Sequence, residues 1–184
     1  MASQRVHPVS VEFQKWLTRS ARSSQQAIGQ LCCLLTVTLV VVLGIAMPAQ
    51  ATDYNREFLA GADFSGRVLT DDSFTKANLR DSNFSQSDLT GVSFFAANLE
   101  KANLEGANLT RATLDSVRFS AANLRNAVLE DAFAFNPIWD GVTIEGADFT
   151  NVEFRPDVLD KLCQIASGTN PTTGRSTKET LMCP

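Results

Sequence analysis

The sequence predicts an all-β solenoid in the central part of the chain, with an export signal before it and a short helical cap after it. Three observations lead to this fold class. Large apolar residues recur at every fifth position over roughly 105 residues, a small residue lies two positions before most of them, and this spacing fits neither a straight helix nor a straight strand. We therefore divide the chain into residues 1–51, 52–156 and 157–184.

Residues 1–51 are predicted to be an export signal. Four basic side chains precede an apolar run from Leu31 to Met47, and Ala49 and Ala51 then give the small-x-small pattern of a signal-peptidase site. We expect cleavage after Ala51. The alternative is an uncleaved membrane anchor, although the 17 residues of the run would form a helix of only about 25 Å against a hydrocarbon core of about 30 Å.

Cleavage would leave little chemistry for catalysis. The only histidine among the 184 residues, His7, lies in the signal together with Cys32 and Cys33. Residues 52–184 keep 12 of the 16 basic and 19 of the 20 acidic side chains, so their formal charge is −7. They offer no imidazole for a catalytic triad or a metal site, no calcium-loop spacing and no glycine-rich phosphate loop. We expect no enzyme, no cofactor and no metal site.

The repeat runs from Tyr54 to Phe154. It has 21 successive positions without insertion or deletion, and 20 of them carry a large apolar residue, the exception being Ala134. From Ala77 to Val152 the residue two positions earlier is always Ala, Ser, Val or Pro. A helix would place successive centres about 140° apart, and a straight strand would send them to opposite faces. The pattern works only if the chain turns within every five residues, so that both positions face a common interior.

The consensus Ala-(Asn/Asp)-(Leu/Phe)-x-x resembles the pentapeptide-repeat family. This resemblance implies a right-handed, four-sided β-helix with 20 residues in each coil, and hence about five coils between residues 52 and 156. Centres 20 residues apart would then stack in four ladders with a spacing of about 4.8 Å. Tyr54, Phe74 and Phe94 belong to one ladder, and Phe119 and Trp139 belong to another.

Residues 157–184 are predicted to cap the solenoid. Apolar residues at helical spacing predict a helix over residues 157–167 with Gly168 as its stop, and Ser176 and Glu179 resemble a capping box for one more helical turn.

The cap contains the two cysteines that follow the signal. In an exported chain a single pair predicts a disulfide, so Cys163 and Cys183 are expected to close the cap, and a redox switch is the alternative. The tail, from Leu162 to Gly174 and ending in Leu-Met-Cys, resembles that of lumenal pentapeptide-repeat proteins of cyanobacteria and chloroplasts. This resemblance implies export to the thylakoid lumen or the periplasm.

One coil departs from the consensus. Ala134 replaces a large centre, while Phe133 and Phe135 take outward positions. Phe95 lies forty residues before Phe135, and therefore on the same side about 10 Å away. One interpretation of Phe95, Phe133 and Phe135 is an apolar docking patch. The alternatives are a bulge that turns one ring into the space left by Ala134, or a tail that covers the rings.

The predicted function is that of a scaffold that binds an unknown protein partner. We expect no nucleic-acid ligand, and contact with a membrane only through an uncleaved signal. One alternative is a DNA mimic that binds DNA gyrase. This role would need a continuous acidic stripe, whereas Arg80 and Glu100, one coil apart, have opposite charges. The other alternative is a redox-responsive lumenal regulator.

Overall fold

The computed structural model describes residues 51–184, which belong to one compact unit, Gln50–Pro184. The predicted export signal lies outside the described residues, except for Ala51 at its end. Between residues 51 and 184 no helix has the length and apolar character needed to cross a membrane.

The chain turns a corner within every five residues. In the first corner the Glu57 N–H donates to the Tyr54 carbonyl oxygen (3.2 Å), and Arg56 has φ of 60°. This left-handed conformation is the one that the third residue of a type II turn requires. Of the 20 corner residues from Arg56 to Asn151, 19 have positive φ, most of them without being glycine, and Asn136 is the exception.

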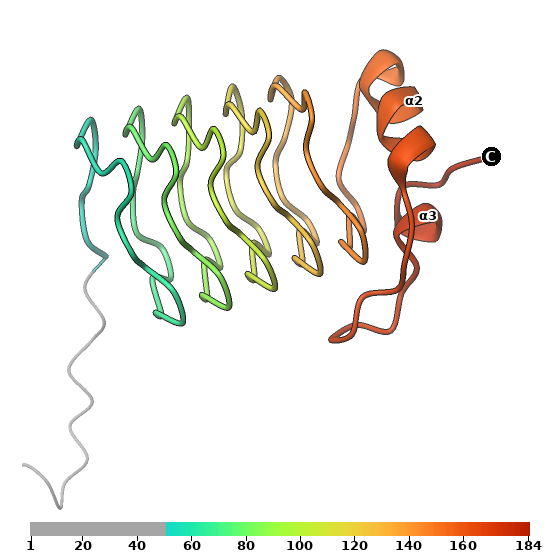
Figure 1. The fold of residues 1–184 in the computed structure, drawn as a ribbon, viewed down its shortest axis with the longest axis horizontal. Coiled ribbons are helices and arrows are strands. Elements are labelled where there is room, and N and C mark those ends of the chain that lie inside the picture. The colour runs from blue at the N-terminus through green and yellow to red at the C-terminus, as the bar shows by residue number, and fades with distance from the viewer. Residues whose placement is uncertain (1–50) are drawn as a thin grey trace, which may run out of the picture. The chain divides into compact units, whose positions relative to one another are not determined.

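Four corners make one coil, because parallel β-bridges join residues 20 apart on each side. Asp53 pairs with Ser73, and Phe58 pairs with Asn78. The bridges are isolated because the chain leaves the extended conformation after each one, so the sides of the solenoid contain no longer strands. Figure 1 shows the coils stacked along one axis, with α2 and α3 beyond the last coil.

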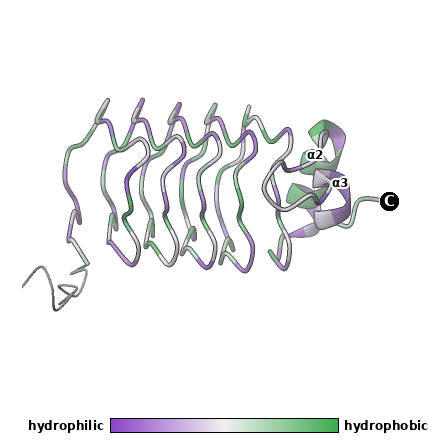
Figure 2. Ribbon diagram, turned by 90° about the horizontal axis from the view of Figure 1, so that it is seen from below, coloured by the Kyte–Doolittle hydropathy of each residue, from purple (hydrophilic) through white to green (hydrophobic). Residues whose placement is uncertain are grey.

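The repeat centres fill the interior in the ladders that the 20-residue coil predicts. The ring of Tyr54 stacks on Phe74 at 4.7 Å between centroids, and Phe119 stacks on Trp139 at 4.9 Å. The inner small residues, such as Ala102, are also buried. Figure 2 shows the resulting alternation of hydrophobic and hydrophilic residues along the coils.

The N-terminal coil explains why charged residues occupy inner positions near the start of the repeat. Glu57 and Arg67 are exposed there, and the Arg67 guanidinium lies 5.4 Å from the ring centroid of Phe64. Asp72 is buried, but its carboxylate accepts a hydrogen bond from the Thr52 N–H (2.6 Å). A charge is tolerated at these positions because solvent or a backbone donor satisfies it.

The tail contains helix α2, Pro156–Ile165, and the single turn α3, Thr177–Thr180. Helix α2 begins one residue before and ends two residues before the predicted bounds, with proline in its first turn. Gly168 is not the helix stop, because the helix ends in the extended residue Ala166. Gly168 instead has φ of +80°, and a Cβ atom there would lie 2.9 Å from the backbone nitrogen of Gly146. The close approach of these two backbones requires glycine.

Asn170 attaches the tail to the last coils. Its side chain is fully buried, and Nδ2 donates to the carbonyl oxygens of Asn126 (3.1 Å), Ala127 (3.2 Å) and Gly146 (2.9 Å). Oδ1 accepts hydrogen bonds from the two backbone N–H groups at residues 172 and 173. Every polar atom of this buried amide therefore has a partner.

Arg175 provides a second attachment. Its Nε donates to Oδ2 of the buried Asp148 (2.7 Å), and Nη2 donates to Oε2 of Glu130 (2.6 Å). Burial raises the pKa of Asp148, but hydrogen bonds from Thr150 and Thr173 and the charge of Arg175 outweigh it, so the pKa lies below its ordinary value. The same contacts raise the pKa of Arg175, with the hydrogen bond to Glu130 as the main cause.

Candidate functional site

The three phenylalanines singled out by the sequence lie at the surface. The exposed fractions are 39% for Phe95, 58% for Phe133 and 60% for Phe135. Neither the core nor the tail covers them, so both burial alternatives are wrong. Phe95 and Phe135 hold the same repeat position two coils apart, with Asp115 between them. We call the three rings the phenylalanine patch.

Asn136 and Pro137 explain why the solenoid is irregular beside Phe133 and Phe135. A residue before proline is restricted mainly to extended conformations, and Asn136 accordingly lacks the positive φ of the other corners. Its N–H donates to the Asp115 carboxylate (3.1 Å) instead of to a carbonyl of the next coil. Pro137 has no N–H with which to close the turn. The corner that would follow Ala134 is therefore opened.

The β-bridges on this side also end at Phe133. Bridges join Ser93 to Thr113 and Thr113 to Phe133, but within residues 51–184 no bridge joins Phe133 to Glu153. A hollow of about 290 Å³ lies where the missing pair would be. The residues that line this hollow, which we call the patch hollow, are Asp131, Ala132, Phe133, Ala134, Phe135, Asn151 and Glu153.

The charged groups of the patch hollow are acidic. Asp131 accepts a hydrogen bond from Nδ2 of Asn151 (2.9 Å). The Glu153 carboxylate is exposed and has neither a hydrogen bond nor an ion pair within the described part of the chain. The nearby Arg155 pairs with Asp157 (3.3 Å). The patch hollow therefore combines apolar rings with two carboxylates that form no ion pair within the described residues.

A second hollow, of about 430 Å³, lies between the last coil and α2, where the sequence predicts no site. Ile138 and Ile165 line it and are partly exposed, beside Lys161 and Asp140. The signal in the sequence was Ile138, an isoleucine at an outward position that Asn or Asp usually holds. The Trp139 Nε1 nearby is buried without a hydrogen-bond partner.

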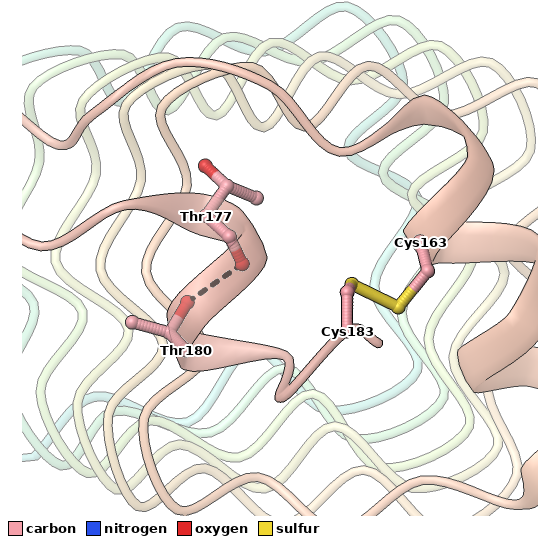
Figure 3. Close-up of a disulfide and its surroundings, with 4 residues drawn as sticks. All are labelled: Cys163, Thr177, Thr180 and Cys183. Atoms are coloured by element: carbon pink, nitrogen blue, oxygen red, sulfur yellow. Dashed lines mark hydrogen bonds between the residues drawn. A yellow bond between two sulfur atoms is a disulfide. The ribbon is translucent and has the colours of Figure 1, made fainter.

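Cys163 of α2 and Cys183 form a disulfide in the structure, with their Cα atoms 5.6 Å apart. Both residues are half-buried, and the bond joins α2 to the segment that follows α3 (Figure 3). In the same view the Thr180 hydroxyl donates to the Thr177 carbonyl oxygen (3.1 Å). The pair therefore links the two helical parts of the tail.

The described residues hold no group of three or more His, Cys, Asp or Glu side chains placed to bind a metal ion. The coils, the bridges at 20-residue spacing and the stacked centres define a repeat protein of the solenoid class.

Comparison with known proteins identifies the family. A family model for pentapeptide repeats matches residues 59–94 and 93–131 in eight copies. A crystal structure of a pentapeptide-repeat protein from the Arabidopsis thaliana thylakoid lumen is 42% identical, with a TM-score of 0.68, and the match covers 68% of this chain and 88% of that one. The chain belongs to the pentapeptide-repeat family.

Two further relatives match smaller parts. Thylakoid lumenal 15 kDa protein 1 of Arabidopsis thaliana is 51% identical over 43 residues, which is 23% of this chain and only 19% of that protein. HetL, from the cyanobacterium Nostoc, is 26% identical with a TM-score of 0.44, and the match covers 52% of this chain and 48% of that one. The chain therefore spans only a small part of this curated relative and about half of HetL.

Proposed function

We propose that the protein is a non-enzymatic scaffold, exported to a lumen-type compartment, that binds a protein partner through the phenylalanine patch. The observation that carries the proposal is the exposure of three large rings together on one side of the solenoid, whereas the other exposed large apolar side chains of the coils, Phe58, Val68 and Ile138, lie on other sides. Aromatic side chains supply much of the binding energy at the centres of protein interfaces. A rigid array of coils can present such rings with little loss of conformational entropy.

Three features support the export. Two relatives are proteins of the thylakoid lumen, a predicted signal precedes the repeats, and the cysteine pair suits an oxidising compartment. We take the coil to be right-handed, and residues 157–184 to act as a cap that covers the apolar end of the last coil.

The gyrase-binding alternative is less well supported. DNA mimicry needs negative charge along a continuous stripe, but Arg80 pairs with Glu100 (3.2 Å) and Arg125 pairs with Glu145, each across adjacent coils. A supercoiling assay with the purified full chain tests it, and inhibition of gyrase at micromolar concentration would support mimicry.

The redox alternative rests on the accessibility of Cys163 and Cys183, which line a surface hollow of about 360 Å³. If the pair is a switch, reduction at physiological potentials will change partner binding. If the pair is structural, it will resist reduction at those potentials.

Photo-crosslinking tests the main proposal. We expect benzoylphenylalanine at position 135 of the full chain to form a discrete adduct with one protein in the native compartment. The matched control is position 143, since Thr143 is exposed and lies half a coil from Phe133, on the opposite side. The variant Phe133→Ser should remove the adduct. The same adducts from both positions, or an adduct at 135 that persists in this variant, would contradict the proposed function.

A further inference from the structure

We infer that the patch hollow binds a cationic side chain, an arginine or a lysine, in a basic segment of the protein partner. This inference rests on the proposed function, because it names the chemistry of the partner that docks on the phenylalanine patch. It follows from the shape of the hollow, from its charges and from the groups that line it.

The shape comes from the interrupted side of the solenoid. Phe133 and Phe135 lie on one edge of the hollow, and Asn151 and Glu153 lie on the other, where the bridge between residues 133 and 153 is missing. A hollow of about 290 Å³ is large enough for one long side chain but too small for a drug-sized ligand. A partner would therefore insert a single residue here while its neighbours contact the exposed rings.

The charges favour a cation. Asp131 and Glu153 line the hollow, neither forms an ion pair within residues 51–184, and Asp115 adds a third carboxylate beside Phe135. Arg155 is the nearest basic residue along the chain, and it is paired with Asp157. The formal charge of −7 on residues 52–184 adds to the local negative potential and would steer a basic segment toward this surface.

The rings favour the same ligand. The face of a phenylalanine ring attracts a guanidinium or ammonium group, while the aliphatic stem of the side chain packs against apolar carbon. The chain already contains this contact, between Arg67 and the ring of Phe64 at the other end of the solenoid. A purely apolar side chain would instead bury the Glu153 carboxylate without a partner, which is unfavourable.

A titration with a matched pair of small probes tests this inference. N-acetyl-arginine amide and its neutral isostere N-acetyl-citrulline amide are added separately to the ¹⁵N-labelled full chain, and amide shifts are followed by NMR. We expect the arginine probe to shift the signals of residues 131–135 and 151–153 saturably, with a dissociation constant in the millimolar range or tighter. We expect the citrulline probe to bind at least tenfold more weakly.

Two variants locate the site. Glu153→Gln should weaken arginine binding several-fold, as should Phe133→Leu. The control Asp160→Asn removes an exposed carboxylate of α2 outside the hollow and should leave the affinity unchanged. Equal binding of the two probes, tighter binding of N-acetyl-leucine amide, or an unchanged affinity of the Glu153→Gln variant would each overturn the inference. Adducts from position 135 would then still support the docking proposal, because crosslinking does not depend on the charge of the partner.

Discussion

Replacing Asn170 by alanine should be among the most damaging single changes in the tail. The substitution removes the Nδ2 donor to three buried carbonyl oxygens and the Oδ1 acceptor for two backbone N–H groups. Nδ2 has only two hydrogens, so these contacts count as at most four full hydrogen bonds, and at about 0.5–1 kcal/mol net for each the loss is about 3 kcal/mol. With a urea m-value of about 2 kcal/mol/M, the unfolding midpoint should fall by about 1.5 M.

The assay is urea unfolding of the full chain, followed by circular dichroism. Gln164→Ala is the matched control, because it also removes an amide from the tail, but from the exposed side of α2. Its effect should stay within about 0.5 kcal/mol. Asn170→Asp, which keeps the acceptor but places a negative charge against the carbonyl oxygens, should cost at least as much as alanine. If Asn170→Ala and Gln164→Ala shift the midpoint equally, the attachment described for Asn170 is wrong.

Three further predictions concern the tail. Thr177→Val should be neutral or stabilising by up to about 1 kcal/mol, because the buried Thr177 hydroxyl has no hydrogen-bond partner among the described residues. Thr180→Val should cost about 1–2 kcal/mol, because the Thr180 hydroxyl accepts a hydrogen bond from the Phe149 N–H and donates one to the Thr177 carbonyl oxygen. Equal effects of the two variants in urea unfolding would refute this reasoning. The lowered pKa of Asp148 contributes stability that is present above the ordinary pKa of 3.8 and is lost as the pH falls through the lower pKa of the folded state. The urea concentration at the unfolding midpoint should therefore decrease when the pH is lowered below about 4. Asp148→Asn should abolish the share of this pH dependence that comes from Asp148. Opening the disulfide between residues 20 apart, by Cys183→Ser, should cost about 3 kcal/mol, and a cost below 1 kcal/mol in the same assay would show that the tail stays ordered without the bond.

The repeat frame could be predicted from the sequence because it depends on a binary pattern. A large residue at every fifth position and a small one two before it leave one arrangement in which both are buried. The 20-residue coil that the family resemblance implies then places Tyr54, Phe74 and Phe94 in one ladder, as the structure shows. The left-handed corners could not be predicted in the same way. Residues such as Arg56 and Lys76 disfavour positive φ, and they adopt it because neighbouring coils fix both ends of each corner.

The tail shows a different limit. Asn170 followed by a proline is typical of a turn. No neighbouring residue in the sequence indicates that the Asn170 amide donates to carbonyl oxygens 24 to 44 residues earlier. The pattern predicts the wrong role for Gly168, because a glycine after an apolar segment fits both a helix stop and a close backbone contact. Long-range contacts decided both residues, and a local pattern contains no information about such contacts.

The candidate site can be predicted in part from the sequence. Phe95, Phe133 and Phe135 could be identified because they break the polar character of their positions. Phe95 is exposed beside a corner that closes normally, whereas Phe133 and Phe135 lie beside a corner that stays open, and the Asn136–Pro137 pair is the local signal for that open corner. The patch hollow could not be predicted, because it arises from a bridge that is missing between two consecutive coils.

The 20-residue spacing of the bridges limits how this molecule can change length. One inserted residue anywhere between Tyr54 and Phe154 would shift the register, and the downstream centres would turn toward water. An insertion of one complete coil between Phe95 and Phe135 would keep the 20-residue register on both sides and would increase the distance between these two rings by about 4.8 Å. The distance along the solenoid axis between two binding residues can therefore change in evolution only by whole coils.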